Sequence, residues 1–300
     1  MVIGGAGFIG SHLVDRLLAE QCSVDVVDDL STGSLANLAV ARSVGGDLKI
    51  HHLDVCAVEF GSLMAMREPD VVVHLGWLPP GRSEPSVQAS AVHGTLNVLE
   101  AARQLGVSKV VTALPAASLY GDVPARELPA KEGRAWAPLG ADGVIAKAVV
   151  ELLSVYRSQH DVEFTALALA NVYGSRQRAD GGVVAAFAYA IRQGTAPIMH
   201  GDGRQSRDFV FIDDVVDAFV RAMRRGSGLV VNVGTGTLTS VRDLWNAMAG
   251  PDAIAPISAP GPADAVTRLS VSPTRARIHL SWAPWTGLAG GLAALTTHAE

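Results

Sequence analysis

The chain has 300 residues, of which 49% are hydrophobic and 18% are charged, and its formal net charge is −5 at pH 7. This composition allows a sizeable core, and a slightly acidic balance without a basic block argues against nucleic acid or an anionic membrane surface as a partner. No apolar run approaches the roughly 20 residues of a membrane-spanning helix, and the start lacks the basic segment of a secretory signal peptide. Cys22 and Cys56 could form only one disulfide, so we expect two free thiols in a reducing cytoplasm.

The first 28 residues predict a strand, a glycine-rich turn, a helix and a second strand in close succession. Three apolar residues precede Gly4, Gly7 and Gly10, which follow the spacing G-x-x-G-x-x-G, and the second strand ends at Asp28. In such a unit the glycines bring the backbone close to a pyrophosphate, and the helix N-terminus holds its charge. The acidic residue accepts the ribose hydroxyls. The segment therefore predicts a dinucleotide site, and the charge of Asp28 favours NAD over NADP.

Strands and helices alternate through the first half of the chain. Apolar runs indicate buried strands over residues 24–27, 49–52, 71–75, 109–113 and 163–168, and helical stretches lie over 11–20, 86–105 and 143–160. This alternation predicts an α/β fold with a doubly wound parallel sheet and right-handed crossovers. In the second half, clusters of Gly, Pro and Ala separate shorter elements, which predicts a smaller C-terminal lobe packed on the sheet.

Several motifs carry a resemblance to a known family. The turn GGAGFIGSHL over residues 4–13, the loop DDLSTG over 28–33 and the helix GTLNVLEA over 94–101 resemble the extended short-chain dehydrogenase/reductase family. That family includes the NAD-dependent sugar-nucleotide epimerases and dehydratases. The resemblance implies a Rossmann-type sheet and NAD as cofactor. The cofactor-binding residues that it implies are Gly4, Gly7, Phe8, Ile9, Gly10, Asp28, Asp29, Asp54, Val55, Leu75, Gly76, Trp77 and Lys147.

The second half resembles the same family at its substrate site. The sequence ANVYG is similar to the segment whose Asn, here Asn171, contacts the substrate's diphosphate, and GDGRQSRDFV is similar to the segment whose Arg, here Arg207, pairs with it. Arg268 falls near the place of a second phosphate arginine. Guanidinium groups bind phosphates in bidentate fashion, although Asp208 beside Arg207 also allows a surface ion pair. We therefore expect a nucleotide-diphosphate sugar as the ligand.

The resemblance also implies how the chain is divided. Residues 1–168 with about 206–235 would form the NAD-binding Rossmann domain, and about 169–205 with 236–300 would form the substrate-binding lobe. The family often dimerises through two helices, here those over 86–105 and 143–160, which makes a homodimer the expected assembly. No histidines stand with partners at ligand spacing, so we expect no metal site.

The proton-transfer residues of that family are largely missing from this chain. The family's catalytic Tyr stands four residues before a Lys, so that both lie on one helical face. Here the Lys is Lys147 and the Tyr position is Gly143. Ala116 replaces the Ser or Thr that would hold the reacting oxygen, and Ala91 stands where an Asn is usual. Because glycine cannot move a proton, the ordinary tyrosine-dependent reaction is not expected.

If the chain is an enzyme, either another group carries the proton or the substrate needs only partial chemistry, such as hydride exchange with an activated keto sugar. Lys147 and Ser118 are the catalytic residues that we predict, and Asp142, Tyr120 or a bound water are alternatives. The protein is then an atypical NAD-dependent epimerase or dehydratase that moves hydride to and from a nucleotide-diphosphate sugar. The alternative is a catalytically impaired homologue that binds both ligands in a regulatory role. Gly143→Tyr, combined with Ala116→Ser, is expected to place a phenol one helical turn from Lys147 and to raise activity.

Overall fold

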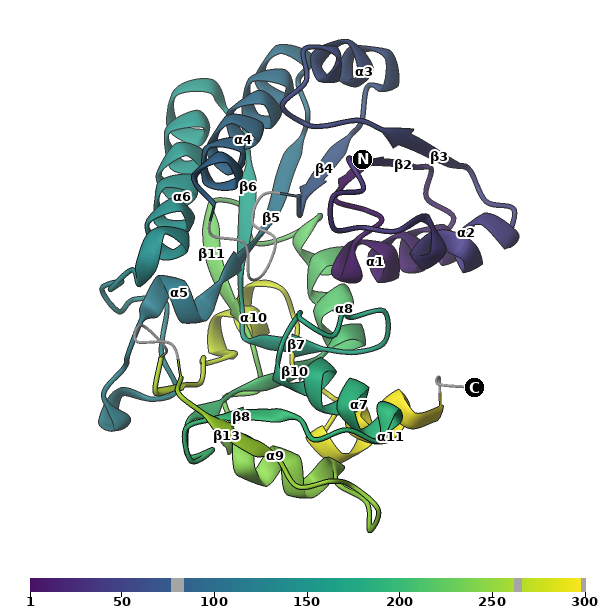
Figure 1. The fold of residues 1–300 in the computed structure, drawn as a ribbon. Helices are drawn as coiled ribbons and strands as arrows, with labels where there is room; N and C mark the ends of the chain where they lie inside the picture. Colours follow the sequence, from purple (N-terminus) through teal and green to yellow (C-terminus); the bar gives the residue numbers. More distant parts are fainter. Residues whose placement is uncertain (77–83, 262–265, 298–300) are drawn as a thin grey trace.

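A parallel sheet of seven strands runs through the centre of the computed structural model, which describes residues 1–76, 84–261 and 266–297 (Figure 1). The strands are β1 (Val2–Ile3), β2 (Val24–Asp28), β3 (Leu48–His52), β4 (Val71–His74), β5 (Lys109–Pro115), β6 (Phe164–Leu169) and β11 (Leu229–Val233). Their order in space is β11-β6-β5-β4-β1-β2-β3, and each neighbouring pair is parallel. This is the doubly wound, Rossmann-type α/β fold that the sequence predicts.

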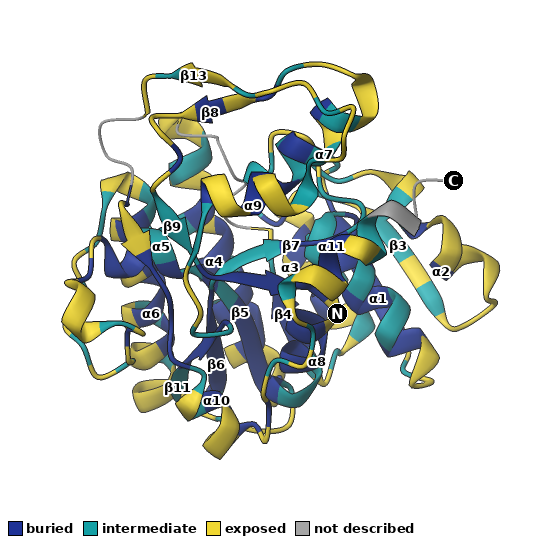
Figure 2. Ribbon diagram, turned by 90° about the horizontal axis from the view of Figure 1, so that it is seen from below, coloured by how far each residue is buried: buried dark blue, intermediate teal, exposed yellow. Residues whose placement is uncertain are grey.

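Helices cover both faces of this sheet (Figure 1). On one face lie α1 (Phe8–Ala19), α2 (Ala39–Ser43) with the short helix η1 (Leu35–Leu38), and α8 (Ile212–Ala222). On the other lie α3 (Glu59–Arg67), α4 (Pro85–Leu105) and α6 (Gly140–His160). Successive strand residues point to opposite faces: Val73 and Val111 join the apolar cluster under α1 and α8, whereas Val72 and Val110 join the cluster under α4 and α6. Figure 2 shows these strands buried and the outer helix surfaces exposed.

The predicted strands and helices are all present, with shifted ends. Strand ends differ from the predicted ones by at most two residues, but α1 and α6 each begin three residues earlier than predicted, at Phe8 and Gly140. The start of α6 reads GADG and lacks the apolar spacing that marks a helical face, so the sequence pattern begins later there. The start of α1, Phe8-Ile9-Gly10, belongs to the glycine-rich motif, which the sequence pattern assigns to the turn. The first strand is as short as expected. Gly4 adds one hydrogen bond to the pairing of β1 with β2, because the Gly4 N–H donates to the Val27 carbonyl at 2.8 Å.

The C-terminal lobe lies beyond the carboxyl ends of the large sheet (Figure 1). It contains three small sheets, which pair β7 (Asn171–Tyr173) with β10 (Phe209–Phe211), β8 (Ile198–His200) with β13 (Ile257–Ala259), and β9 (Ser206–Arg207) with β12 (Thr239–Ser240) and β14 (Arg268–Leu269). The remaining helices are α5 (Ala116–Tyr120), η2 (Ala125–Glu127), α7 (Val183–Gln193), α9 (Val241–Met248), α10 (Thr274–His279) and α11 (Leu288–Thr297). Within residues 206–235, α8 and β11 join the large sheet and its helical layer, while β9 and β10 belong to the small sheets.

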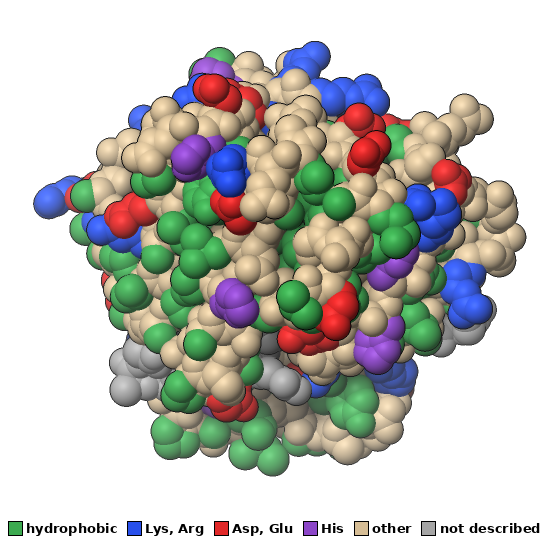
Figure 3. Space-filling view, turned by 90° about the horizontal axis from the view of Figure 1, so that it is seen from above, with side chains coloured by type: hydrophobic (Ala, Val, Ile, Leu, Met, Phe, Trp, Pro, Cys, Tyr) green, Lys and Arg blue, Asp and Glu red, His purple; other side chains and the backbone are tan. Residues whose placement is uncertain are grey.

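The surface carries charges of both signs. Figure 3 shows the face at the top of Figure 1, away from the lobe, where Lys and Arg side chains are interspersed with Asp and Glu. None of the described helices is both long enough and apolar enough to cross a membrane. Cys22 and Cys56 are free thiols, as the sequence predicts.

Candidate active site

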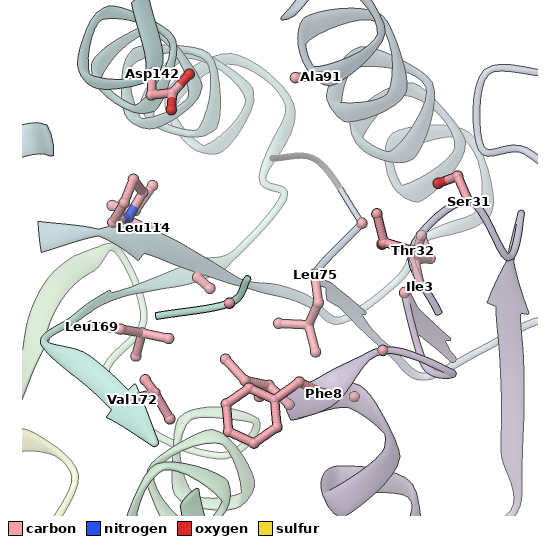
Figure 4. A pocket seen from close by; sticks show the side chains of 18 of the residues that line it. Ile3, Phe8, Ser31, Thr32, Leu75, Ala91, Leu114, Asp142, Leu169 and Val172 are labelled. Atoms are coloured by element: carbon pink, nitrogen blue, oxygen red, sulfur yellow. The ribbon is translucent and has the colours of Figure 1, made fainter. Parts of the chain in front are cut away.

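A cavity of about 660 Å³ opens at the carboxyl ends of the strands. It lies over β1 and β4, where the strand order reverses, which is the usual place of a ligand in an open parallel sheet. Its wall joins segments that are far apart in the sequence: the turn after β1, the ends of β2 to β6, the first turns of α4 and α6, and β7 with Phe209 in the lobe. Figure 4 shows Phe8, Leu75, Leu114 and Val172 around the open space. The volume is typical of a small-molecule or cofactor site.

The glycine-rich turn forms one end of the cavity. Gly4 has a φ of 76°, in the left-handed region, and a Cβ there would lie 2.9 Å from the Gly76 nitrogen. A Cβ on Gly10 would lie 2.7 Å from the Gly5 Cα, so glycine allows α1 to pack against the turn. Gly7 lines the cavity and is the N-cap of α1, whose first turn has no acidic residue. The positive end of the helix therefore faces the cavity, as an anion site requires.

Asp28 lines the cavity at the end of β2 and is 7% exposed. Each carboxylate oxygen accepts one backbone bond: Oδ2 from the Ala6 N–H at 2.8 Å, and Oδ1 from the Leu30 N–H at 2.9 Å. Burial raises the pKa of Asp28, and these two hydrogen bonds oppose that rise. The carboxylate is thus held in one orientation and retains lone pairs for further donors.

The other predicted cofactor residues fall on the same wall, with two exceptions. Phe8, Ile9, Asp29, Asp54, Val55, Leu75 and Gly76 all line the cavity. Trp77 lies outside the described residues. Lys147 is absent from the described lining: its side chain is 48% exposed and its Nζ lies 3.7 Å from Glu151 Oε1, one turn along α6.

The predicted substrate residues are separated by the fold. Asn171, at the start of β7, lines the large cavity. Arg207, on β9, lines a second cavity of about 380 Å³ that shares Ala117, Ser118 and Asp142 with the first. Burial lowers the pKa of the Arg207 guanidinium, which the charge of Asp122 opposes. Arg268, on β14 beside β9, is exposed and is not among the described lining of either cavity.

Asp208 does not neutralise Arg207. Its carboxylate is 1% exposed and turns inward, where Oδ1 accepts from the Thr235 N–H at 2.9 Å and Oδ2 accepts from Gly236 and Val271 N–H groups at 2.9 and 3.2 Å. The Arg207 guanidinium instead donates to the backbone carbonyls of Ser206 and Thr267. The surface ion pair that the sequence allowed is therefore not formed, and the arginine charge is available at the second cavity.

Small side chains surround the place where proton transfer would occur. Ala91 from α4, and Ala116 and Ala117 from α5, line the large cavity. Ser118 and Asp142 line both cavities. Figure 4 shows Asp142 on α6 and Ala91 on α4 on the same side of the open space. Of the proton carriers considered from the sequence, Ser118 and Asp142 are therefore the two that the structure brings to this wall.

Tyr120 is not on this wall, because its side chain points into the core. It is fully buried and its phenol donates to Asn232 Oδ1 at 2.8 Å. Burial raises its pKa to about 12, so this phenol holds its proton. The structure gives it a packing and hydrogen-bonding role between α5 and β11.

The space beside Gly143 is too small for a side chain. A Cβ built on it would overlap the Ser118 carbonyl oxygen, and would lie 3.0 Å from the Ser118 carbonyl carbon and 3.1 Å from that of Pro138. The same Ser118 oxygen accepts the Leu139 N–H at 2.7 Å. Backbone therefore fills this space, and a tyrosine at position 143 would have to displace it. That Gly143→Tyr raises activity stays a prediction.

Sequence reasoning missed part of the lobe's contribution to the site. Gln177, residues 181–184 and Phe209 line the large cavity. The Gln177 amide donates to the Val172 and Gly181 carbonyls at 3.1 and 3.0 Å, and so holds the loop after β7. Phe209 lies in the same sequence motif as Arg207, so that motif could have identified Phe209 as a residue of the site. Within the described ranges, no three His, Cys, Asp or Glu side chains are grouped to hold a metal ion.

Comparison with known proteins identifies the family that this chain and its fold resemble. The model of the NAD dependent epimerase/dehydratase family matches residues 1–234. The chain is 41% identical over 306 aligned positions to a UDP-glucose 4-epimerase of Mycolicibacterium smegmatis, covering 98% of this chain and 96% of that protein. The structure of a UDP-glucose 4-epimerase with UDP-glucose from Thermotoga maritima matches with a TM-score of 0.91 and 31% identity, over 99% of this chain and 97% of that one. A Thermus thermophilus UDP-glucose 4-epimerase in complex with NAD matches with a TM-score of 0.88 and 31% identity, over the same shares.

Proposed function

The chain belongs to the NAD-dependent epimerase/dehydratase family. From this premise, we propose that it moves hydride to and from a nucleotide-diphosphate sugar and that it uses an atypical acid/base. The observation that carries the proposal is one continuous cavity that joins Asp28 at one end to Asn171 and Ser118 at the other. It has room for a dinucleotide and for the reacting part of a sugar. The relatives named above are UDP-sugar enzymes, which favours a UDP-sugar as substrate.

NAD is the cofactor of this family, and the residues present fit it. The Gly4–Gly10 turn leaves backbone where a pyrophosphate approaches, and the start of α1 offers it a positive end. The fixed Asp28 carboxylate would accept the ribose hydroxyls and repel a 2′-phosphate, so NAD is preferred over NADP. When bound, the nicotinamide supplies a reversible hydride acceptor.

At the substrate end, the chain offers binding groups of fitting charge. We assign Asn171 and Arg207 to the diphosphate, since a half-buried guanidinium without a carboxylate partner among the described ion pairs binds phosphate strongly. Arg268 lies one strand away and would act at the outer edge of this site. Ser118 would hydrogen-bond the reacting hydroxyl. Lys147, on the exposed side of α6, is assigned no contact with the substrate.

We also propose that the protein is a homodimer that pairs α4 and α6 with those of a second copy. These two helices pack side by side on the outer face of the sheet (Figure 1). Val144 and Val155 on α6 are 60% and 43% exposed, and Leu105 at the end of α4 is 39% exposed. A second copy would cover this apolar surface.

The test of substrate class is calorimetric titration of UDP-galactose and UDP-glucose into the NAD-loaded protein. Arg207→Ala should weaken their binding by roughly 1.5–3 kcal/mol, the scale of hydrogen bonds to charged groups, and leave free galactose unaffected. Arg204→Ala is the matched control, because that neighbouring arginine is 84% exposed and pairs with Asp202. Identical titration curves for the wild type and Arg207→Ala would show that Arg207 does not bind the diphosphate. Absence of binding of both nucleotide sugars to the wild type would show that the substrate class is wrong.

A further inference from the structure

The end of the cavity beside α5 and α6 contains one ionisable side chain from those two helices. The described lining there consists of Ala116, Ala117 and Ser118 from α5 and Asp142 from α6. The other lining aspartates, Asp28, Asp29 and Asp54, follow β2 and β3 at the adenosine end. Asp142, one residue before Gly143, is therefore the carboxylate that α5 and α6 contribute to the described lining at this end of the cavity.

The backbone fixes Asp142 at this place. The Leu139 N–H donates to the Ser118 carbonyl at 2.7 Å, and the Gly143 N–H donates to the Leu139 carbonyl at 3.2 Å. Because Gly143 has no side chain, the first turn of α6 rests directly on the Ser118 backbone. Asp142 consequently lies where the two cavities meet, between the wall of the nicotinamide end and the cavity that contains Arg207.

The competing groups lie elsewhere. Lys147 is half exposed beside Glu151, and the Tyr120 phenol is buried against Asn232. Ser118 reaches both cavities, but a neutral hydroxyl passes a proton on only when another group accepts it. A carboxylate accepts a proton directly when it lies within hydrogen-bond reach of the reacting group.

We propose that Asp142 is the general base and acid of the reaction, a role that rests on the hydride-transfer function proposed above. In the forward step the sugar's O–H bond breaks and its proton passes to the Asp142 carboxylate. The C–H bond on the same carbon breaks and its electron pair leaves as hydride to NAD⁺, so the carbon is oxidised to a carbonyl and NAD⁺ is reduced to NADH. In the return step the carbonyl carbon would take back a hydride from the reduced nicotinamide, and Asp142 would return the proton to the oxygen.

The experiment compares the wild type with Asp142→Asn, which keeps the shape of the side chain and removes its basicity. NAD and UDP-galactose should bind to the variant with affinities within about threefold of wild type, measured by calorimetry. Turnover should fall by about 10²–10⁴, the range for a lost acid/base, and Asp142→Glu should recover part of it. Asp213→Asn is the matched control, because Asp213 is an exposed aspartate in the first turn of α8 and lies outside the described lining of both cavities.

The outcomes separate this inference from the proposed function. If Asp142→Asn turns over at nearly the wild-type rate, or if Lys147→Met instead abolishes turnover, the inference is wrong and the function stands. If the wild type binds both ligands tightly but converts no nucleotide sugar, the proposed hydride transfer is wrong, and the inference, which rests on it, is wrong with it. If the wild type binds no nucleotide sugar at all, the proposed function itself fails. A loss of kcat with unchanged binding, together with a changed pH dependence of kcat/KM, supports Asp142.

Discussion

Asp208 illustrates how a single carboxylate can take a different role from the one its sequence neighbours suggest. Next to Arg207 in the chain, it allows a surface ion pair. In the fold it is buried and binds backbone groups of Thr235, Gly236 and Val271. Those partners lie 27 to 63 residues away in the sequence, so no local pattern could reveal them. The place of Asp28 on the cavity wall, in contrast, was predictable, because it follows from the position of Asp28 at the end of a strand in a local unit.

Asp28 also makes cofactor binding depend on pH. Burial raises its pKa above the ordinary aspartate value of about 3.9. Above the raised pKa the carboxylate is ionised and accepts the ribose hydroxyls, whereas below it the added proton removes this charge. NAD affinity should therefore be constant near neutral pH and fall as the pH is lowered through the raised pKa. Calorimetry from neutral pH down toward the ordinary aspartate pKa of about 3.9 measures this fall.

The matched variant is Asp28→Asn, which cannot ionise. It should bind NAD more weakly at neutral pH by about 1–3 kcal/mol, the scale for loss of a charge-assisted hydrogen bond, and should lose the fall at low pH. A fall of equal size in both proteins would assign the pH dependence to another group.

Among the elements, the strands were more predictable than the starts of the helices. Buried parallel strands such as β4 and β6 are continuous apolar runs, which the sequence reports directly. The first turn of α6 contains two glycines, Gly140 and Gly143, and no apolar period. Its course is set by the contact with α5 at Ser118, which is a tertiary interaction that the sequence does not display.

This contact predicts that a methyl group at position 143 destabilises the fold. In an open helix, Gly→Ala stabilises by roughly 1 kcal/mol. At Gly143 the added Cβ overlaps the Ser118 carbonyl, so Gly143→Ala should lower the free energy of unfolding by about 1–3 kcal/mol, as overpacking does. Gly61→Ala in α3 is the control, because a Cβ there meets nothing within 4 Å. Urea unfolding of both variants is the measurement, and equal stabilisation of the two would refute the packing argument.

At the scale of the whole molecule, the site depends on both the large sheet and the lobe. The two are connected at several places, including a hydrogen bond between His12 Nε2 and Ser175 Oγ at 3.0 Å and an ion pair between Arg176 and Asp15 at 2.7 Å. Alternation of elements predicted the sheet, and motifs predicted which segments reach the cavity. That the two cavities share Asp142 in their walls could not be predicted. It depends on how Arg207 of the lobe strand β9 is placed relative to the start of α6.

The proposed homodimer gives a prediction at the same scale. Val155→Glu places a charge on the exposed side of α6 and should convert the dimer to a monomer, because a charge buried without a partner in an apolar interface is costly. Val58→Glu is the control, since Val58 is 89% exposed and lies before α3, away from α4 and α6. Sedimentation equilibrium measures both. A dimer that persists in Val155→Glu would exclude this face as the interface.

The seating of α6 on the Ser118 carbonyl also has a consequence for redesign. Any side chain at position 143 would meet backbone, which cannot turn aside as a flexible side chain does. A designer who wants a tyrosine there must first choose substitutions that part α5 from α6. The order of the changes therefore matters, because a side chain that is excluded when introduced alone can be accommodated after them.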